Sequence, residues 1–203
     1  MDIMLDMETM SSQPNAAIAS IGAVAFNPDV ITPYSEMDPS WRISLHLDLR
    51  QQEGRHFDGD TIYWWLKQSN EARGALQPPR GIAPTHPLVA LQEFTRWYGV
   101  VNGGRCWSFG ATFDNVLLVD LYRWCHLACP VHYRDQACAR TVIQLADVGR
   151  PQIPGLVAHG ALDDAIIQTI WLQQALAKLR GQTPSQTSTI VPGQISSPRD
   201  IHF

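Results

Sequence analysis

Apolar positions near the beginning of the chain fall into three short runs separated by polar turns. Residues 3–9 begin with three apolar side chains, and residues 17–26 are almost wholly apolar or small. Both patterns predict largely buried strands. Residues 41–49 alternate instead, with Ile or Leu at every odd position from 43 and polar side chains between them. This alternation predicts a strand with one solvated face, so the opening of the chain is expected to form an antiparallel meander.

From residue 60 onwards the apolar spacing becomes helical, and Asp60 is the expected N-cap of the first helix. A glycine-bounded apolar segment at 105–110 predicts a buried strand, and a last short strand is expected at 133–136. The expected helices cover about 60–73, 87–98, 112–127, 138–146 and 161–180. A meander followed by alternating helices and strands predicts an α/β domain with a mixed sheet flanked by helices.

Composition places this domain in residues 1–180. The chain has 203 residues, of which 45% are hydrophobic and 17% charged, so a single domain with a substantial core is expected. Residues 181–203 are dominated by Gln, Thr, Ser and Pro, which bury little apolar surface. They predict a flexible polar C-terminal tail.

Charge and cysteine usage exclude some classes of protein. A formal net charge of -4 argues against a broad basic surface that grips nucleic acid, although a small site for it stays open. No signal-peptide pattern precedes the first strand, and no apolar run approaches the ~20 residues of a membrane span. We therefore expect a cytoplasmic location, no membrane partner and reduced thiols. One alternative is a zinc site built from the segment Cys125 to His132, although its cysteines also suit a helix core.

Carboxylates stand at the ends of several predicted elements. Asp6 and Glu8 are two residues apart on the first strand, so they share a face and repel one another. A divalent cation would compensate that repulsion, and a solvated strand edge is the alternative. Asp114 opens a helix after a buried strand, and His159 and Asp164 lie at the start of the last helix. Helix capping and dipole stabilisation also explain acids at such positions, and a lone histidine is commonly structural.

In combination these motifs resemble the DEDDh 3′–5′ exonucleases. They are, in chain order, residues 5–9 (LDMET), 113–115 (FDN) and 159–165 (HGALDDA). The resemblance covers roughly residues 3–180. Within the family, the chain is most similar to the stand-alone branch of phage exonuclease A and a mycobacterial exoribonuclease. The segments that carry this closer similarity are 16–22, 61–65 with Gln68, Arg134-Asp135 and Arg140-Thr141.

The resemblance implies an RNase H-like fold with a mixed five-stranded sheet. It also implies hydrolysis of single-stranded or overhanging RNA or DNA from the 3′ end, with release of nucleoside 5′-monophosphates. The implied site has His159 as general base and four ligands for two Mg²⁺ (or Mn²⁺): Asp6, Glu8, Asp114 and Asp164. Asp163 is the neighbouring alternative to the last ligand, but the spacing of the family favours Asp164.

Candidate substrate contacts are the backbone at Met7 and Thr9 and the rings of Phe113, Trp64 and Trp65. The tryptophans equally suit a helix core, and stacking on bases would be tolerant of sequence. The alternative function is a non-catalytic RNase H-like module that binds nucleic acid or protein. The choice between RNA and DNA stays open, as does a homodimer, which is common among relatives.

Overall fold

A single mixed sheet forms the centre of the molecule in the computed structural model, which describes residues 1–181. Its strands are β1 (Asp2–Thr9), β2 (Ile18–Phe26), β3 (Arg42–His46), β4 (Cys106–Ser108) and β5 (Gln136–Cys138). They lie in the order β3-β2-β1-β4-β5. β1 therefore occupies the middle of the sheet, where both its edges are paired. The predicted tail lies outside the described residues, apart from Gly181.

The sheet confirms the expected mixture of strand directions. β1 pairs antiparallel with β2, and β2 pairs antiparallel with β3, which is the predicted meander. β1 also pairs in parallel with β4, and β4 in parallel with β5. The third strand is shorter than predicted, because the chain turns into short 3-10 segments at 39–41 and 49–51.

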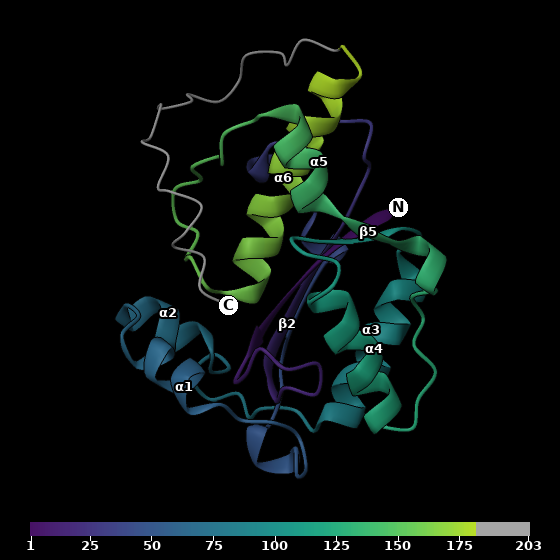
Figure 1. Cartoon of the computed structure of the whole chain (residues 1–203). Helices are drawn as coiled ribbons and strands as arrows, with labels where there is room; N and C mark the ends of the chain where they lie inside the picture. Colours follow the sequence, from purple (N-terminus) through teal and green to yellow (C-terminus); the bar gives the residue numbers. More distant parts are fainter. Residues whose placement is uncertain (182–203) are drawn as a thin grey trace.

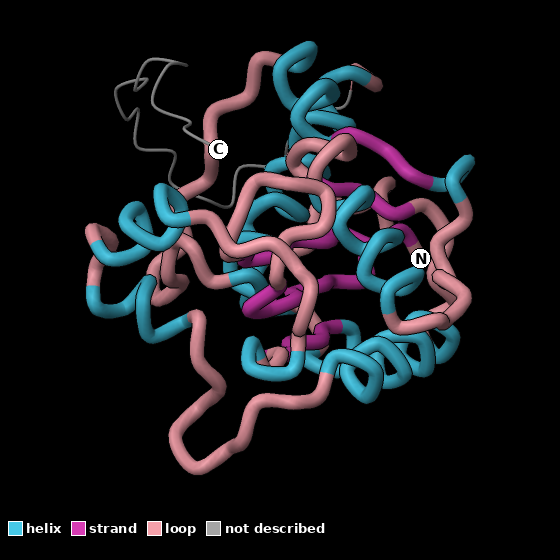
Figure 2. The backbone as a smooth tube through the Cα atoms, turned by 60° about the horizontal axis from the view of Figure 1, so that its bottom comes forward, coloured by secondary structure: helices cyan, strands magenta, loops and turns pink. Residues whose placement is uncertain are grey.

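Two pairs of helices cover the two faces of the sheet (Figure 1). In chain order the helices are α1 (Gly59–Leu66), α2 (Asn70–Ala75), α3 (Pro87–Val100), α4 (Asp114–Trp124), α5 (Ala139–Ala146) and α6 (Ala161–Leu179). The pairs are α3 with α4 and α5 with α6, and Figure 2 shows the magenta strands between cyan helices. Alternate side chains of β1 point to opposite faces of the sheet. Ile3 and Leu5 pack with α3 and α4, and Met4 packs with α5 and α6. Strand periodicity then places Asp6 and Glu8 on the same face as α6.

The first predicted helix is in fact two helices, and its predicted cap is wrong. Asp58, rather than Asp60, is the N-cap of α1, because its carboxylate accepts hydrogen bonds of 2.9 Å from both the amide and the hydroxyl of Thr61. The chain then leaves the helix after Leu66, and Ser69 caps α2 by accepting from an amide in its first turn. Either acid suits an N-cap, and only the local hydrogen bonds select between them.

Two further details differ from the sequence predictions. The last strand lies at 136–138, because residues 133–135 form a 3-10 turn instead. Within the described residues, the ligand atoms of the Cys125–His132 segment do not converge on one point. Cys125 is buried in the core beneath α3 and α4, and Cys129 packs against it, as their interpretation as small apolar residues predicts. No described helix has both the length and the apolar character that a membrane span requires.

Candidate active site

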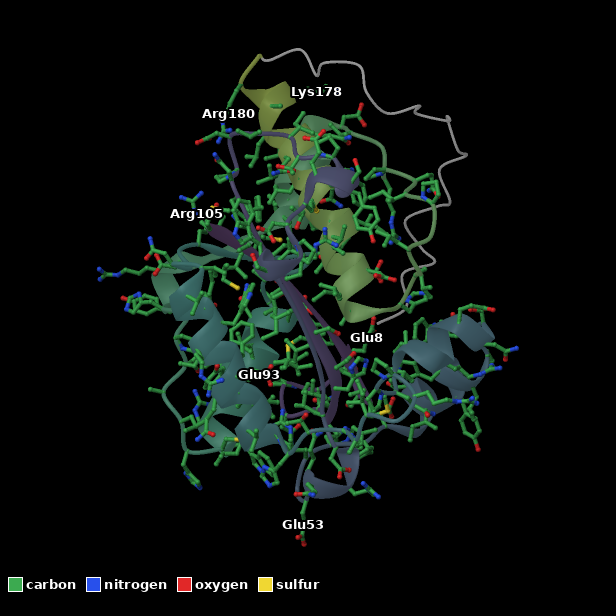
Figure 3. All side chains as sticks on the ribbon, turned by 180° about the vertical axis from the view of Figure 1, so that it is seen from behind. Glu8, Glu53, Glu93, Arg105, Lys178 and Arg180 are labelled. Atoms are coloured by element: carbon green, nitrogen blue, oxygen red, sulfur yellow. The ribbon has the colours of Figure 1, made fainter. Side chains whose placement is uncertain are left out.

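The site begins at the end of β1 that faces the start of α6. Asp6 pairs with Gly22 of β2 and Glu8 with Ser20, and the register shifts between Glu8 and Thr9. Figure 3 shows Glu8 at this end of the sheet, beside the beginning of α6. The irregularity ends regular pairing directly after the two acids, as bulges near functional sites do.

A close backbone approach brings α6 to these carboxylates. A Cβ at Gly22 would lie 2.2 Å from the carbonyl carbon of Ala161 and from the amide nitrogen of Leu162. Only a residue without a side chain fits there. The first turn of α6 therefore rests directly on β2, next to the strand that carries Asp6.

Three carboxylates converge as a result. Asp6, Glu8 and Asp164 each offer an oxygen, and these atoms all lie within 4.8 Å of one another. Asp114, the first residue of α4, lines the same cavity and raises the pKa of both Asp6 and Glu8. The structure thus brings together all four acids that the sequence motifs singled out.

Burial makes this cluster electrostatically costly. Desolvation, followed by the nearby Glu8, raises the pKa of Asp6 well above its ordinary range. Desolvation and the charges of Asp164 and Asp114 raise the pKa of Glu8 to about 8. Desolvation also raises the pKa of Asp114 to about 7, against the opposing effect of hydrogen bonds to its carboxylate. Buried carboxyl groups that cannot all ionise at once form a donor set for a hard divalent cation, because the charge of a bound cation would let all of them be negative.

Two neighbours of the cluster were missed by the sequence motifs. Gln168 donates a 2.8 Å hydrogen bond to Asp6, and Arg150 donates a 2.6 Å hydrogen bond within an ion pair to Asp164. Gln168 lies one helical turn after Asp164, so the i, i+4 spacing was a signal that could have found it. Arg150 lies in the Pro- and Gly-bearing loop before α6, where no periodicity marks a position.

His159 lies beside the cluster on a strained stretch of backbone. Its φ is 64°, in the left-handed region, and its amide donates a 2.9 Å hydrogen bond to the second oxygen of Asp164. The ring meets Trp64 and Trp65 edge-on, with centroids 5.0 and 6.2 Å away. Burial lowers the pKa of His159, which favours the neutral imidazole. Asp163 instead accepts a 2.8 Å hydrogen bond from the amide of Val157 and so secures the preceding loop.

A cavity of about 620 Å³ opens over these groups. The predicted substrate contacts Met7, Thr9, Phe113, Trp64 and Trp65 all line it. Trp65 is only 5% exposed and donates a 2.9 Å hydrogen bond to the carbonyl of Thr9, so it belongs mainly to the core. The sequence motifs assigned no place in the site to the other lining residues, which are Asp58, Asp60, Thr61, Tyr63, Lys67, Phe109, Arg140 and Gln168.

An RNase H-like sheet that gathers Asp-x-Glu, a later Asp and His-x4-Asp around one cavity defines the DEDDh class of exonuclease domains. The chain belongs to this class. Its family is the Rv2179c-like 3′–5′ exoribonuclease domain, whose family model matches residues 1–176.

A phage relative is consistent with this placement. The chain is 34% identical over 132 residues to an exodeoxyribonuclease of Enterobacteria phage T4, covering 60% of this chain. It spans little more than half of that relative, namely 56% of its length.

Solved structures share the fold at low sequence identity. The nuclease domain of 3′hExo, a DEDDh family member bound to rAMP, superposes with a TM-score of 0.51 at 13% identity, covering 89% of this chain and 92% of that domain. S. pombe Pop2p, in a Mg²⁺- and Mn²⁺-bound form, gives a TM-score of 0.53 at 9% identity, covering 91% of this chain and 86% of Pop2p.

Proposed function

We propose that this chain is a 3′–5′ exonuclease that releases nucleoside 5′-monophosphates from single-stranded or overhanging nucleic acid. The observation that carries the proposal is the convergence of Asp6, Glu8 and Asp164 within 4.8 Å, with Asp114 in the same cavity. A buried, all-carboxylate cluster of this kind has no structural benefit to offset its repulsion, whereas it suits cation-assisted phosphodiester hydrolysis.

The residues present fit a pair of Mg²⁺ or Mn²⁺ ions. Every donor is a carboxylate oxygen, and the raised pKa values of Glu8 and Asp114 indicate that the acids lack sufficient compensating charge from the protein. Asp6, Glu8, Asp114 and Asp164 would hold the ions. When bound, such ions neutralise the phosphodiester, activate a water and stabilise the leaving oxygen.

His159 is the proposed general base. Its pKa is lowered by burial, so an imidazole nitrogen is free to accept a proton from the attacking water near pH 7. The hydrogen bond from its amide to Asp164 ties the position of the base to that of a proposed ligand. The proton acceptor is thereby held at a fixed position relative to the carboxylates.

Substrate contacts follow from the cavity wall. The backbone at Met7 and Thr9 lies beside the carboxylates, and the half-buried ring of Phe113 is the proposed stacking surface for the terminal base. Trp64 is also half-buried and meets both the cavity and His159, so it is placed to bound the terminal nucleotide. Trp65 supports this wall from the core.

The test uses 5′-labelled single-stranded RNA and DNA with magnesium or manganese. Both polymers are needed because the family model is described as an exoribonuclease, whereas the phage T4 relative is called an exodeoxyribonuclease. A ladder that shortens from the 3′ end of either polymer supports the proposal. Unchanged substrate, together with no cation uptake in a calorimetric titration, would instead favour the non-catalytic module.

A further inference from the structure

One face of α1 forms a wall of the cavity. Asp60, Tyr63, Trp64 and Lys67 all line it, at the spacing of neighbours on one side of a helix. Trp64 contacts His159 at the middle of this face. Asp60, Tyr63 and Lys67, on either side of that contact, are exposed, so these parts of the wall are open to solvent.

Tyr63 presents an aromatic ring that the protein leaves uncovered. It is 65% exposed, although it borders a cavity in which the other aromatic side chains are half-buried or buried. Ile62 and Leu66, exposed on the same helix, do not line the cavity. An exposed tyrosine ring at the mouth of a nucleotide-sized cavity is a surface on which any base can stack.

Lys67, the C-cap residue of α1, follows Tyr63 by four residues and so lies next to it. The chain contains only two lysines, Lys67 and Lys178, which makes the position of this one at the cavity informative. Lys178 donates a hydrogen bond to the carbonyl of Asp147, whereas within residues 1–181 no carboxylate forms an ion pair with Lys67. Its ammonium is exposed and free to meet an anion.

The opposite end of the same face is acidic. Asp60 lies about two helical turns before Lys67, in the first turn of α1. A phosphate is therefore attracted to one end of the face and repelled from the other. This difference in charge favours passage of a nucleic-acid backbone past the Lys67 end of α1.

We propose that Tyr63 and Lys67 form a subsite for the part of a single strand that lies on the 5′ side of the nucleotides at the carboxylates. A base stacks on Tyr63 and the neighbouring phosphate pairs with Lys67. The inference rests on the proposed function, because that function places the 3′ end of the strand at the carboxylates. It assigns to this chain a preference for strands of several nucleotides over dinucleotides. Stacking and charge pairing recognise no particular sequence.

The test measures binding in the Asp6→Ala background, where the strand stays intact. The probes are fluorescein-labelled single strands of about 2 and about 12 nucleotides, within the range of single-strand site sizes. Tyr63→Ala is expected to raise the Kd of the long strand about fivefold or more. Lys67→Gln is expected to raise it as well, and to reduce the slope of log Kd against log salt by about 0.7, the signature of one phosphate contact on a single strand. Asp60→Asn is expected to leave binding of the long strand unchanged or tighter.

Matched controls lie elsewhere on the surface. Tyr133 is 67% exposed, and Lys178 is the other lysine, so Tyr133→Ala and Lys178→Gln should leave both affinities unchanged. Equal losses for the short and long strands would overturn the subsite, as would an unaltered salt slope in Lys67→Gln. If Tyr63→Ala changes the sedimentation of the protein but not its affinity for the strands, α1 is an interface between copies of the chain. That result would also overturn the subsite. Absence of hydrolysis by the parent protein contradicts the proposed function and leaves this binding comparison intact.

Discussion

Gly22 and Ala161 are in such close backbone contact that a single methyl group at Gly22 would lie 2.2 Å from the carbonyl carbon of Ala161. Gly22 pairs with Asp6 across the sheet, and Ala161 begins the helix that carries Asp164. The contact therefore sets the distance between the two halves of the carboxylate cluster. A position in the second strand that carries no functional group controls whether the site can form.

Gly22→Ala should consequently damage both the fold and the site. The added methyl must displace the start of α6, at a cost of at least ~1–3 kcal/mol in the free energy of unfolding. Chemical denaturation measures this loss, and a calorimetric titration should show weakened cation binding. Gly74→Ala is the control, because Gly74 is helical with open space around its Cα, so alanine should be neutral or stabilising by up to ~1 kcal/mol. An undisturbed Gly22→Ala protein would contradict this account of the site.

Asp163 and Asp164 are adjacent acids with different expected roles. Asp164→Asn removes a charge from the cluster and should reduce hydrolysis more than about a hundredfold, since the cations that Asp164 is proposed to hold would supply several kcal/mol. Asp163→Asn removes a hydrogen bond to the loop at Val157 and should change kcat only modestly. Comparable kcat values for the two variants would show that the ligand is misassigned.

His159→Asn separates proton transfer from cation binding. Asparagine tolerates the left-handed backbone at φ 64°, so the loop should keep its path while the proton acceptor is lost. We expect kcat to fall about 10²–10⁴-fold. Cation affinity, followed by calorimetry, should stay within a small factor of the parent. His56, which hydrogen-bonds Ser11 and does not line the cavity, provides the matched His56→Asn variant with unchanged kcat.

The raised carboxyl pKa values predict how stability depends on pH without cations. With the pKa of Glu8 at about 8 and that of Asp114 at about 7, the folded protein binds more protons than the unfolded chain between their ordinary values near 4 and these raised ones. The free energy of unfolding should therefore decrease as pH rises from about 4 to about 8, by on the order of a few kcal/mol. Denaturation in a chelator measures the decrease. Added Mg²⁺ or Mn²⁺ should reverse it most strongly at pH 8, and a flat profile would speak against a buried acidic cluster.

Arg150 is the cationic partner of Asp164 and should oppose cation binding. Its ion pair at 2.6 Å places positive charge beside the cluster. Arg150→Gln removes that charge, so the affinity for Mg²⁺ should rise about three- to tenfold. Arg180→Gln breaks an exposed ion pair with Asp29 at 2.8 Å and serves as the control, with no effect on affinity expected. Weaker binding in Arg150→Gln would mean that the arginine organises the site instead.

The parts of the fold that the sequence predicts are those with strong local patterns. The buried character of residues 3–9 and 17–26 predicts the central hairpin because a two-sided core demands apolar side chains on both faces. The apolar band of residues 161–180 similarly predicts α6 to within a residue. The four acids and His159 follow from spacing combined with family resemblance, and the structure places all five at one cavity.

The remaining details depend on contacts that no local pattern encodes. Asp58 and Asp60 are equivalent candidates for a cap, and their difference arises from the hydrogen bonds to Thr61. Arg150 reaches Asp164 only through the path of an irregular loop. The core position of Trp65 depends on its bond to Thr9, 56 residues earlier. Tertiary geometry decides all three.

The hydrogen bond between Asp6 and Gln168 joins residues 162 positions apart, which has a consequence for biosynthesis. A ribosome adds about 5–20 residues per second, so on the order of ten seconds separates the synthesis of β1 from that of α6. During that interval the nascent chain carries Asp6, Glu8 and later Asp114 without the helix that closes the cluster. The order of elements along the chain thus delays completion of the carboxylate cluster until almost the whole domain has been synthesised.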